Sequence, residues 1–210
     1  MSKRGLFITF EGPEGAGKST HAEALGRWLR GRGIPVLVTR EPGGTPIGQR
    51  IRRLLLDRRS GAIDPLVELW LYEAARSALV VEVIWPALKA GKICIVDRFQ
   101  DSTWVYQGWA GEVPLAVAQA AGKMATGGLR PDVTILLDLP VEKGLRRVRR
   151  PNRMEEKSLL FHKKVRAGYL VLARRERRRF HVIRADAPIE EVREKIRQVI
   201  GNVLEKHRWA

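Results

Sequence analysis

Five short apolar runs recur along the chain at residues 6–10, 36–39, 93–96, 133–137 and 180–183, each as long as a β-strand. Their nearly continuous apolar character is typical of strands buried in a parallel sheet. Amphipathic segments of helical period separate them, and in the last one Val192, Ile196, Val199, Ile200 and Val203 share one face. Strands that alternate with helices predict an α/β fold of three layers, a five-stranded parallel sheet flanked by helices.

A glycine-rich segment directly follows the first apolar run. The residues Gly12, Pro13, Glu14, Gly15, Ala16, Gly17, Lys18 and Ser19 fit the pattern G-x-x-x-x-G-K-[ST], and Thr20 continues into a helix expected over 19–30. In such a loop the backbone N–H groups surround phosphates, the lysine reaches the β- and γ-phosphates, and the hydroxyl binds Mg²⁺. The other interpretation is a glycine-rich turn with no ligand. The full match between a strand and a helix favours nucleoside triphosphate binding.

Polar residues also follow the second and third runs. Residues 39–45 read Thr-Arg-Glu-Pro-Gly-Gly-Thr and include Arg40, while Asp97 and Arg98 end the third run. Ligands of α/β proteins bind at the carboxyl ends of the strands, so these segments are expected to meet the phosphate loop in one cleft. Asp97 could lie near Mg²⁺ and Arg98 could bind phosphate, although Asp97 could also simply cap the following helix.

The charge is the unusual part of the composition. Lys and Arg number 39 and Asp and Glu 23, which gives a net charge of +16 in 210 residues. A nucleic-acid partner is one explanation, and a kinase that handles two phosphorylated substrates, with solvated arginines elsewhere, is the other. The basic run 174–179 is expected to be a solvated helix end.

The remaining composition indicates one globular domain over residues 1–210, without a linker or repeat. Cys94 is the single cysteine and lies in an apolar run, so it is expected to be a buried thiol. The start of the chain does not read as a signal peptide, and no apolar stretch is long enough to span a bilayer. These features favour a cytoplasmic protein with no membrane partner.

Five spaced motifs resemble those of the thymidylate kinases. They are the phosphate loop with the preceding Phe10-Glu11, residues 39–45, residues 97–108 (Asp-Arg-Phe-Gln-Asp-Ser-Thr-Trp-Val-Tyr-Gln-Gly), residues 131–140, and Arg166-Ala167-Gly168-Tyr169. They appear in the family's order and cover nearly the whole chain. The resemblance implies a P-loop kinase fold and, with Mg²⁺, transfer of the γ-phosphoryl of ATP to dTMP, which gives dTDP for dTTP biosynthesis.

The resemblance also implies roles for individual residues. Tyr72 would stack on thymine where the family usually has Phe, Arg76 would contact the base and phosphate, and Gln107 would bind the base. Tyr106 would favour deoxyribose, and Glu14 would face the 3′-hydroxyl. Arg40, Arg98 and Ser102 complete the set implied for dTMP. The phosphate loop, Thr20 and Arg147 would bind ATP, and Ser19 and Asp97 would bind the metal. Catalysis would depend on Lys18, Asp97, Arg98 and Arg153. Tyr72 could instead be an ordinary core aromatic.

A water-excluding lid is expected at about 146–157, where the sequence is rich in arginine. Family members without an arginine in the phosphate loop supply a catalytic arginine from the lid, which implies Arg153 here, followed by Arg149 and Arg150. A solvated basic turn is the other interpretation. The lid is short and reads Asn152-Arg153-Met154-Glu155-Glu156-Lys157 where the family has D-R-x-E-x-E, and Ala75 and Ala78 also depart from the family pattern.

Three functional hypotheses therefore stand. The first is a dTMP kinase, which the resemblance implies is a homodimer packed through helices in the region 66–83. The second is a kinase for another acceptor, such as dUMP or a deoxynucleoside. The third is a noncatalytic P-loop protein that binds nucleic acid, although the arginines are scattered rather than gathered in a stripe, so we expect no specific nucleic-acid partner.

Overall fold

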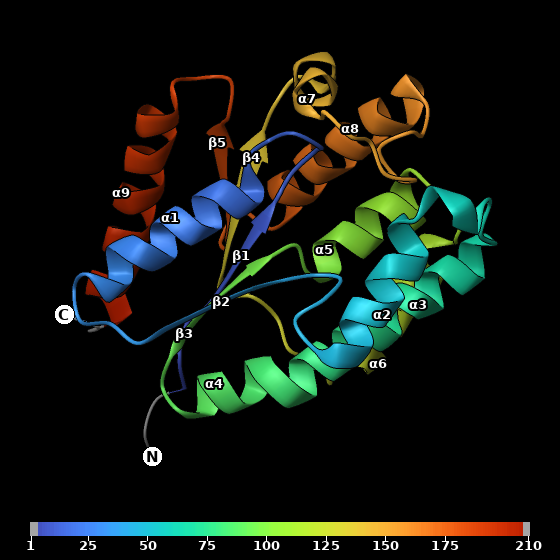
Figure 1. Cartoon of the computed structure of the whole chain (residues 1–210). Helices are drawn as coiled ribbons and strands as arrows, with labels where there is room; N and C mark the ends of the chain where they lie inside the picture. Colours follow the sequence, from blue (N-terminus) through green and yellow to red (C-terminus); the bar gives the residue numbers. More distant parts are fainter. Residues whose placement is uncertain (1–3, 208–210) are drawn as a thin grey trace.

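A five-stranded, all-parallel sheet forms the centre of the computed structural model, which describes residues 4–207 (Figure 1). Its strands are β1 (Phe7–Glu11), β2 (Val36–Arg40), β3 (Ile93–Asp97), β4 (Val133–Asp138) and β5 (Phe180–Arg184). They are arranged in the order β2-β3-β1-β4-β5. All five strands and the parallel sheet predicted from the apolar runs are confirmed, and their ends differ from the prediction by a residue or less.

Helices cover both faces of the sheet. On one face α1 (Lys18–Arg30) and α9 (Ile189–His207) pack against strand residues such as Ile8, Ile95 and Ile135. On the other face the core contains Phe7, Cys94 and Val96 together with apolar residues of α3 (Pro65–Leu79), the π-helical turn η2 (Val80–Ile84) and α4 (Trp85–Lys89). Further along this face, α8 (Leu159–Arg175) and the π-helical turn η3 (Trp104–Trp109) pack against residues of β4 and β5. The three-layer arrangement is thus confirmed.

The remaining elements connect these layers. α2 (Pro46–Leu56) packs on α3, which also contacts α6 (Leu115–Thr126), and Figure 1 shows α2 and α3 side by side, away from α1 and α9. A 3-10 turn, η1 (Arg58–Ser60), follows α2, and α5 (Gln100–Thr103) precedes η3. α7 (Val141–Arg147) follows β4. Residues 148–158, between α7 and α8, form neither a helix nor a strand.

Three expectations about burial are tested by the fold. Cys94 is fully buried, as expected. The expectation of buried strands is wrong for the two strands at the edges of the sheet: β2 is only half-buried, and Val182 of β5 is 50% exposed. The basic run is solvated at Arg174, Arg175, Arg177 and Arg178, but Arg179 is buried against Asp101, with Nη1–Oδ2 and Nη2–Oδ1 distances of 2.6 and 2.7 Å. In residues 4–207 no helix is both long and apolar enough to cross a membrane.

Candidate active site

The loop between β1 and α1 approaches its neighbours too closely for side chains at its glycines. Gly17, directly before α1, has a φ of 86°, and a Cβ at Gly15 would lie 2.1 Å from the carbonyl oxygen of Gly144 in α7. Lys18 starts α1 and is 7% exposed, and its Nζ donates to the carbonyl oxygens of Pro13 at 2.8 Å and Gly12 at 3.2 Å. Burial, together with nearby Arg98, lowers the pKa of Lys18 to about 8. The ammonium thus lies within the loop that would surround phosphates.

A hydroxyl and a carboxylate meet beside this loop, and both offer oxygen, the ligand atom that Mg²⁺ prefers. Ser19 Oγ donates to Asp97 Oδ2 at the end of β3. The other oxygen, Asp97 Oδ1, is buried and accepts no hydrogen bond within residues 4–207. Magnesium prefers oxygen ligands and is usually held by one or two carboxylates together with substrate phosphates. The two side chains therefore fit Mg²⁺, and the described residues contain no cluster of three acidic, His or Cys side chains that would bind a metal without phosphates.

Arg98 links the phosphate loop to two tyrosines. Its φ of 69° is a left-handed conformation, which turns the chain sharply after β3. Arg98 Nη2 lies 2.9 Å from both carboxylate oxygens of Glu14 and donates to Tyr106 Oη at 3.1 Å, while Nη1 donates to Ser102 Oγ and Tyr169 Oη, both at 3.2 Å. Burial opposes ionisation of Glu14, but Arg98 and Lys18 outweigh it and lower its pKa to about 2. The pair is therefore ionised at neutral pH.

The carboxylate of Glu11 is buried beside the turn that carries Arg98. Glu11 accepts hydrogen bonds from Phe99 N at 2.8 Å, Ser102 Oγ at 2.6 Å and Tyr169 Oη at 2.8 Å. Burial raises the pKa of Glu11 to about 7, and the nearby Asp101 adds to the shift. These contacts hold the turn after β3 in place and so fix the position of Arg98.

Three side chains one helical turn apart, Glu68, Tyr72 and Arg76, line the inner side of α3. Arg76 is 2% exposed, and it pairs with Glu41 (Nε–Oε2 2.6 Å) and Glu73 (Nη1–Oε1 2.6 Å). Its Nη1 also donates to Thr103 Oγ1 at 2.9 Å and its Nη2 to Phe99 O at 3.3 Å. Because both carboxylates are buried with it, the guanidinium is held in one orientation.

The carboxylate of Glu68 connects Gln107 to Arg153. It accepts from Gln107 Nε2 at 2.9 Å through Oε1 and from Arg153 Nη2 through Oε2. Arg153 Nε also donates to Leu55 O at 2.8 Å. Its guanidinium therefore contacts α2 and α3 instead of the phosphate loop.

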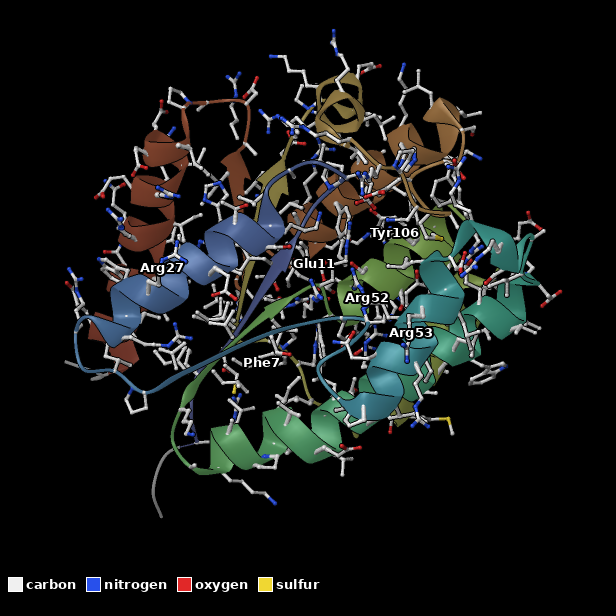
Figure 2. All side chains as sticks on the ribbon, in the orientation of Figure 1. Phe7, Glu11, Arg27, Arg52, Arg53 and Tyr106 are labelled. Atoms are coloured by element: carbon white, nitrogen blue, oxygen red, sulfur yellow. The ribbon has the colours of Figure 1, made fainter. Side chains whose placement is uncertain are left out.

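A cavity of about 380 Å³ unites these groups. Figure 2 shows Arg52 of α2 and Tyr106 of η3 beside the end of β1 that carries Glu11. From the expected set the wall contains Glu14, Gly15, Gly17, Lys18, Ser19, Thr20, Arg40, Tyr72, Arg76, Asp97, Arg98, Ser102, Tyr106 and Gln107. Gly12, Pro13 and Ala16 belong to the loop behind the wall, and Arg147 and Arg153 also lie off it. One cavity is thus lined by the phosphate loop together with arginines, aromatic side chains and an amide.

A sequence model of the thymidylate kinase family matches residues 10–196. The chain belongs to this family. The thymidylate kinase of Syntrophotalea carbinolica is 45% identical over 208 residues, which cover 95% of this chain and 96% of the relative. That of Symbiobacterium thermophilum is 46% identical, with 95% and 94% covered. The crystal structure of the thymidylate kinase from Ehrlichia chaffeensis superposes with a TM-score of 0.77 at 31% identity and covers 94% of this chain and 99% of its own.

Arg147, which lies outside the cavity wall, contacts the phosphate loop from α7. It ends α7, and its Nη1 lies 3.3 Å from Gly15 O and 3.5 Å from Ala185 O. The chain therefore has a cation where the phosphate loop meets the segment after β5.

Sequence reasoning missed several residues of the wall, of which Arg52 is the clearest. Its Nη1 donates to Pro42 O at 2.9 Å, and burial together with nearby Arg40 lowers its pKa. Helical spacing could have found it, since Arg52 lies one turn after Gly48 on the buried side of α2. Leu56 was also missed. The remaining wall residues had not been singled out but lie in segments expected at the cleft: Glu41 and Pro42 in 39–45, Thr103 in 97–108, and Val148, Asn152, Met154 and Glu155 in the expected lid.

Proposed function

We propose that this chain transfers the γ-phosphoryl of ATP to the 5′-phosphate of dTMP and so provides dTDP, the precursor of dTTP. The observation that carries the proposal is the single cavity that contains the phosphate loop at one end and Tyr72, Arg76 and Gln107 at the other. Transfer between two phosphates needs alignment and charge stabilisation more than covalent chemistry. A wall rich in cations and poor in free bases suits that requirement.

The donor end would bind ATP. The backbone of residues 12–17 and the N-terminus of α1 would surround the phosphates, and Lys18 would exchange the carbonyl oxygens of Gly12 and Pro13 for phosphate oxygens. Ser19 and Asp97 would hold Mg²⁺, which neutralises charge on the phosphates when bound. Arg147, exposed beside Gly15 and Ala185, would lie against the adenosine.

The acceptor end would bind dTMP. Tyr72 would stack on the base, and Arg76 and Gln107 would contact its polar edge. Arg40, Arg98 and the previously unexpected Arg52 would hold the 5′-phosphate, with Ser102 beside it. Tyr106 and Glu14, joined by a 2.8 Å hydrogen bond, would border the sugar and favour deoxyribose. Arg98 would then contact the phosphate that attacks and the loop that holds the phosphoryl donor.

Residues 148–158 would act as the lid. Val148, Asn152, Met154 and Glu155 already line the cavity, so the segment covers the region between the two substrates. For Arg153 to serve the transferring phosphoryl group, its side chain would exchange Glu68 for phosphate on nucleotide binding. Arg149 and Arg150, both exposed, are the alternatives in the same segment.

The protein would work as a homodimer in the cytoplasm. Large apolar side chains are exposed on three neighbouring helices: Ile47 and Leu54 on α2, Leu66, Val67 and Trp70 on α3, and Val117 and Met124 on α6. Burial of this surface against a second copy would remove apolar area from water. The helix α3 at its centre is the one expected from the sequence.

The test is an acceptor panel. The protein would be incubated with ATP, Mg²⁺ and each of dTMP, dUMP, dCMP, dGMP and dAMP, and ADP formation followed. Turnover that depends on dTMP supports the proposal. Equal turnover with several acceptors argues for a broader kinase, and no turnover from a folded, ATP-binding protein contradicts phosphoryl transfer altogether.

A further inference from the structure

The side-chain amide of Gln107 donates a hydrogen bond to the carboxylate of Glu68, which does not line the acceptor cavity. Gln107 lies on the cavity wall, whereas Glu68 does not, and both side chains are buried, at 5% and 4% exposed. Their contact joins Gln107 Nε2 and Glu68 Oε1 at 2.9 Å. Among the described residues of the cavity wall, Gln107 is the one that the Glu68 side chain hydrogen-bonds.

The charge of Glu68 determines which way the amide points. An ionised carboxylate can only accept hydrogen bonds, so the amide group facing it must be the NH₂. Arg153 on Oε2 and Lys157 at 3.8 Å from Oε1 place two cations beside this carboxylate. Within residues 4–207, no donor contacts Gln107 Oε1. The atom that Gln107 offers to the cavity is consequently an acceptor.

Arg76 offers the opposite group. Four of its five N–H groups donate to Glu41, Glu73, Thr103 and the carbonyl oxygen of Phe99, which leaves one on Nη2. The wall thus combines a fixed donor with a fixed acceptor. A 4-oxopyrimidine such as thymine has the complementary pair, an acceptor at O4 and a donor at N3–H, whereas cytosine has a donor at N4 and an acceptor at N3.

We propose that Glu68 is a positioning residue for base selection, because it holds Gln107 with its oxygen toward the acceptor and so favours thymine over cytosine. The inference rests on the proposed function, since it names what distinguishes the accepted base. A mispaired base would leave buried polar groups without partners, which costs more than the matched bond gains.

The first variant, Glu68→Gln, keeps the shape and removes the charge. Its oxygen still accepts from Arg153, and its NH₂ then faces Gln107, whose amide turns over and presents a donor to the cavity. We expect the ratio of kcat/KM for dTMP to kcat/KM for dCMP to fall by about tenfold or more. A side chain that merely supports the fold would lower both values together and leave the ratio unchanged.

The decisive variant is the exchange Glu68→Gln with Gln107→Glu. The amide at 68 accepts from Arg153 and donates to the carboxylate at 107, which again presents only acceptors to the base. We expect the double variant to recover the preference for dTMP that Glu68→Gln loses. If Glu68→Gln does not fold, the double variant still decides: a ratio like that of the unaltered protein supports the proposal, and a ratio near one overturns it.

The matched control is Glu191→Gln, which removes an exposed carboxylate of α9 that pairs with Lys195 and lies off the cavity wall. We expect its activity and ratio to equal those of the unaltered protein. An unchanged ratio in Glu68→Gln would overturn the role of Glu68 and leave the dTMP kinase reaction intact. A failure of that reaction would appear in the unaltered protein, before any variant is made.

Discussion

Arg98 Nη2 lies 2.9 Å from each carboxylate oxygen of Glu14, so an ion pair joins the turn after β3 to the phosphate loop. The two segments that would hold the acceptor phosphate and the donor phosphates are therefore connected directly. Arg98 also donates to Tyr106, Ser102 and Tyr169, which leaves its guanidinium little freedom. This arrangement orients a fixed cation toward the place where the two phosphates would meet.

Replacement of Arg98 should affect catalysis more than folding. We expect Arg98→Ala to lower kcat/KM for dTMP by roughly 10²–10³, the usual loss when one fixed donor to a developing charge is removed. Arg98→Lys should recover little of this loss, because an ammonium lacks the planar fork that contacts Glu14 and phosphate together. Steady-state kinetics with ADP detection would measure both, and ATP affinity should stay within a few-fold. An Arg98→Lys variant with normal kcat/KM would contradict the expected geometry.

The same ion pair predicts a pH dependence of stability. The pKa of Glu14 is about 2 in the folded protein, below the ordinary value of 4.5. The folded state therefore favours the carboxylate, and its stabilisation is complete above about pH 4.5 and is lost as the pH falls toward 2. This difference corresponds to a contribution on the order of 3 kcal/mol. Urea unfolding from pH 7 to pH 3 should show a shallower loss in Glu14→Gln than in the unaltered protein, and parallel curves would refute it.

Loss of the Asp97 charge should weaken the use of magnesium. We expect Asp97→Asn to raise the Mg²⁺ concentration needed for half-maximal activity by roughly 10–100-fold, because a carboxylate binds Mg²⁺ better than an amide. Asp132→Asn is the matched control, since Asp132 pairs with Arg4 outside the cavity. Titration of Mg²⁺ at fixed ATP measures both variants. An unchanged requirement in Asp97→Asn would remove Asp97 from the metal site.

Gly144 of α7 packs closely against the phosphate loop, so a side chain at this position should push the loop and the helix apart. A Cβ added to Gly144 would lie 2.2 Å from the carbonyl oxygen of Glu14. We expect Gly144→Ala to cost about 1–3 kcal/mol of stability and to raise KM for ATP, because α7 and the phosphate loop must move apart. Gly201→Ala on α9 is the control: nothing lies within 4 Å of its added Cβ, and it should be neutral or stabilising. Thermal unfolding would measure the stability of both variants, and ATP titration would measure their KM for ATP. Equal values for Gly144→Ala and Gly201→Ala would argue against close packing at Gly144.

A charge on the apolar face of α3 should disrupt the proposed dimer. Trp70 is 53% exposed, and Trp70→Glu would place a carboxylate in the buried interface, which we expect to raise the dimer dissociation constant at least tenfold. Leu160→Glu on α8, where Leu160 is 65% exposed, should leave the assembly unchanged. Sedimentation or light scattering across a concentration series would measure this. A Trp70→Glu protein that remains dimeric would place the interface elsewhere.

The sheet and the phosphate loop were predictable from the sequence because each is local. The five strands are continuous apolar runs, and the loop is a contiguous motif whose glycines meet close neighbours. The edge position of β2 was not visible, since strand order is determined by pairing between distant segments. Local pattern therefore predicted the elements and their type, but not how exposed each would be.

The sequence could not predict which residues pair with the long charged side chains. Arg76 was expected at the acceptor, but its carboxylate partner Glu41 lies 35 residues away, and the Glu68 partner of Arg153 lies 85 residues away. An arginine side chain can reach several neighbours, and only the packed fold decides among them. For the same reason Arg179 appeared to be one of several solvated arginines until its buried contact with Asp101 was seen.

Different elements carry the groups for the base and those for the phosphates, which affects how the sequence of such a protein can evolve. The groups that would contact the base lie on α3 and η3, whereas those that would hold the phosphates lie on the turns that leave β1 and β3, at the end of β2 and on α2. Substitutions on the two helical segments can alter which nucleotide is accepted while the strand-end turns stay as they are. A lineage, or a protein engineer, could therefore explore new acceptors by small steps without first giving up the ability to move phosphate.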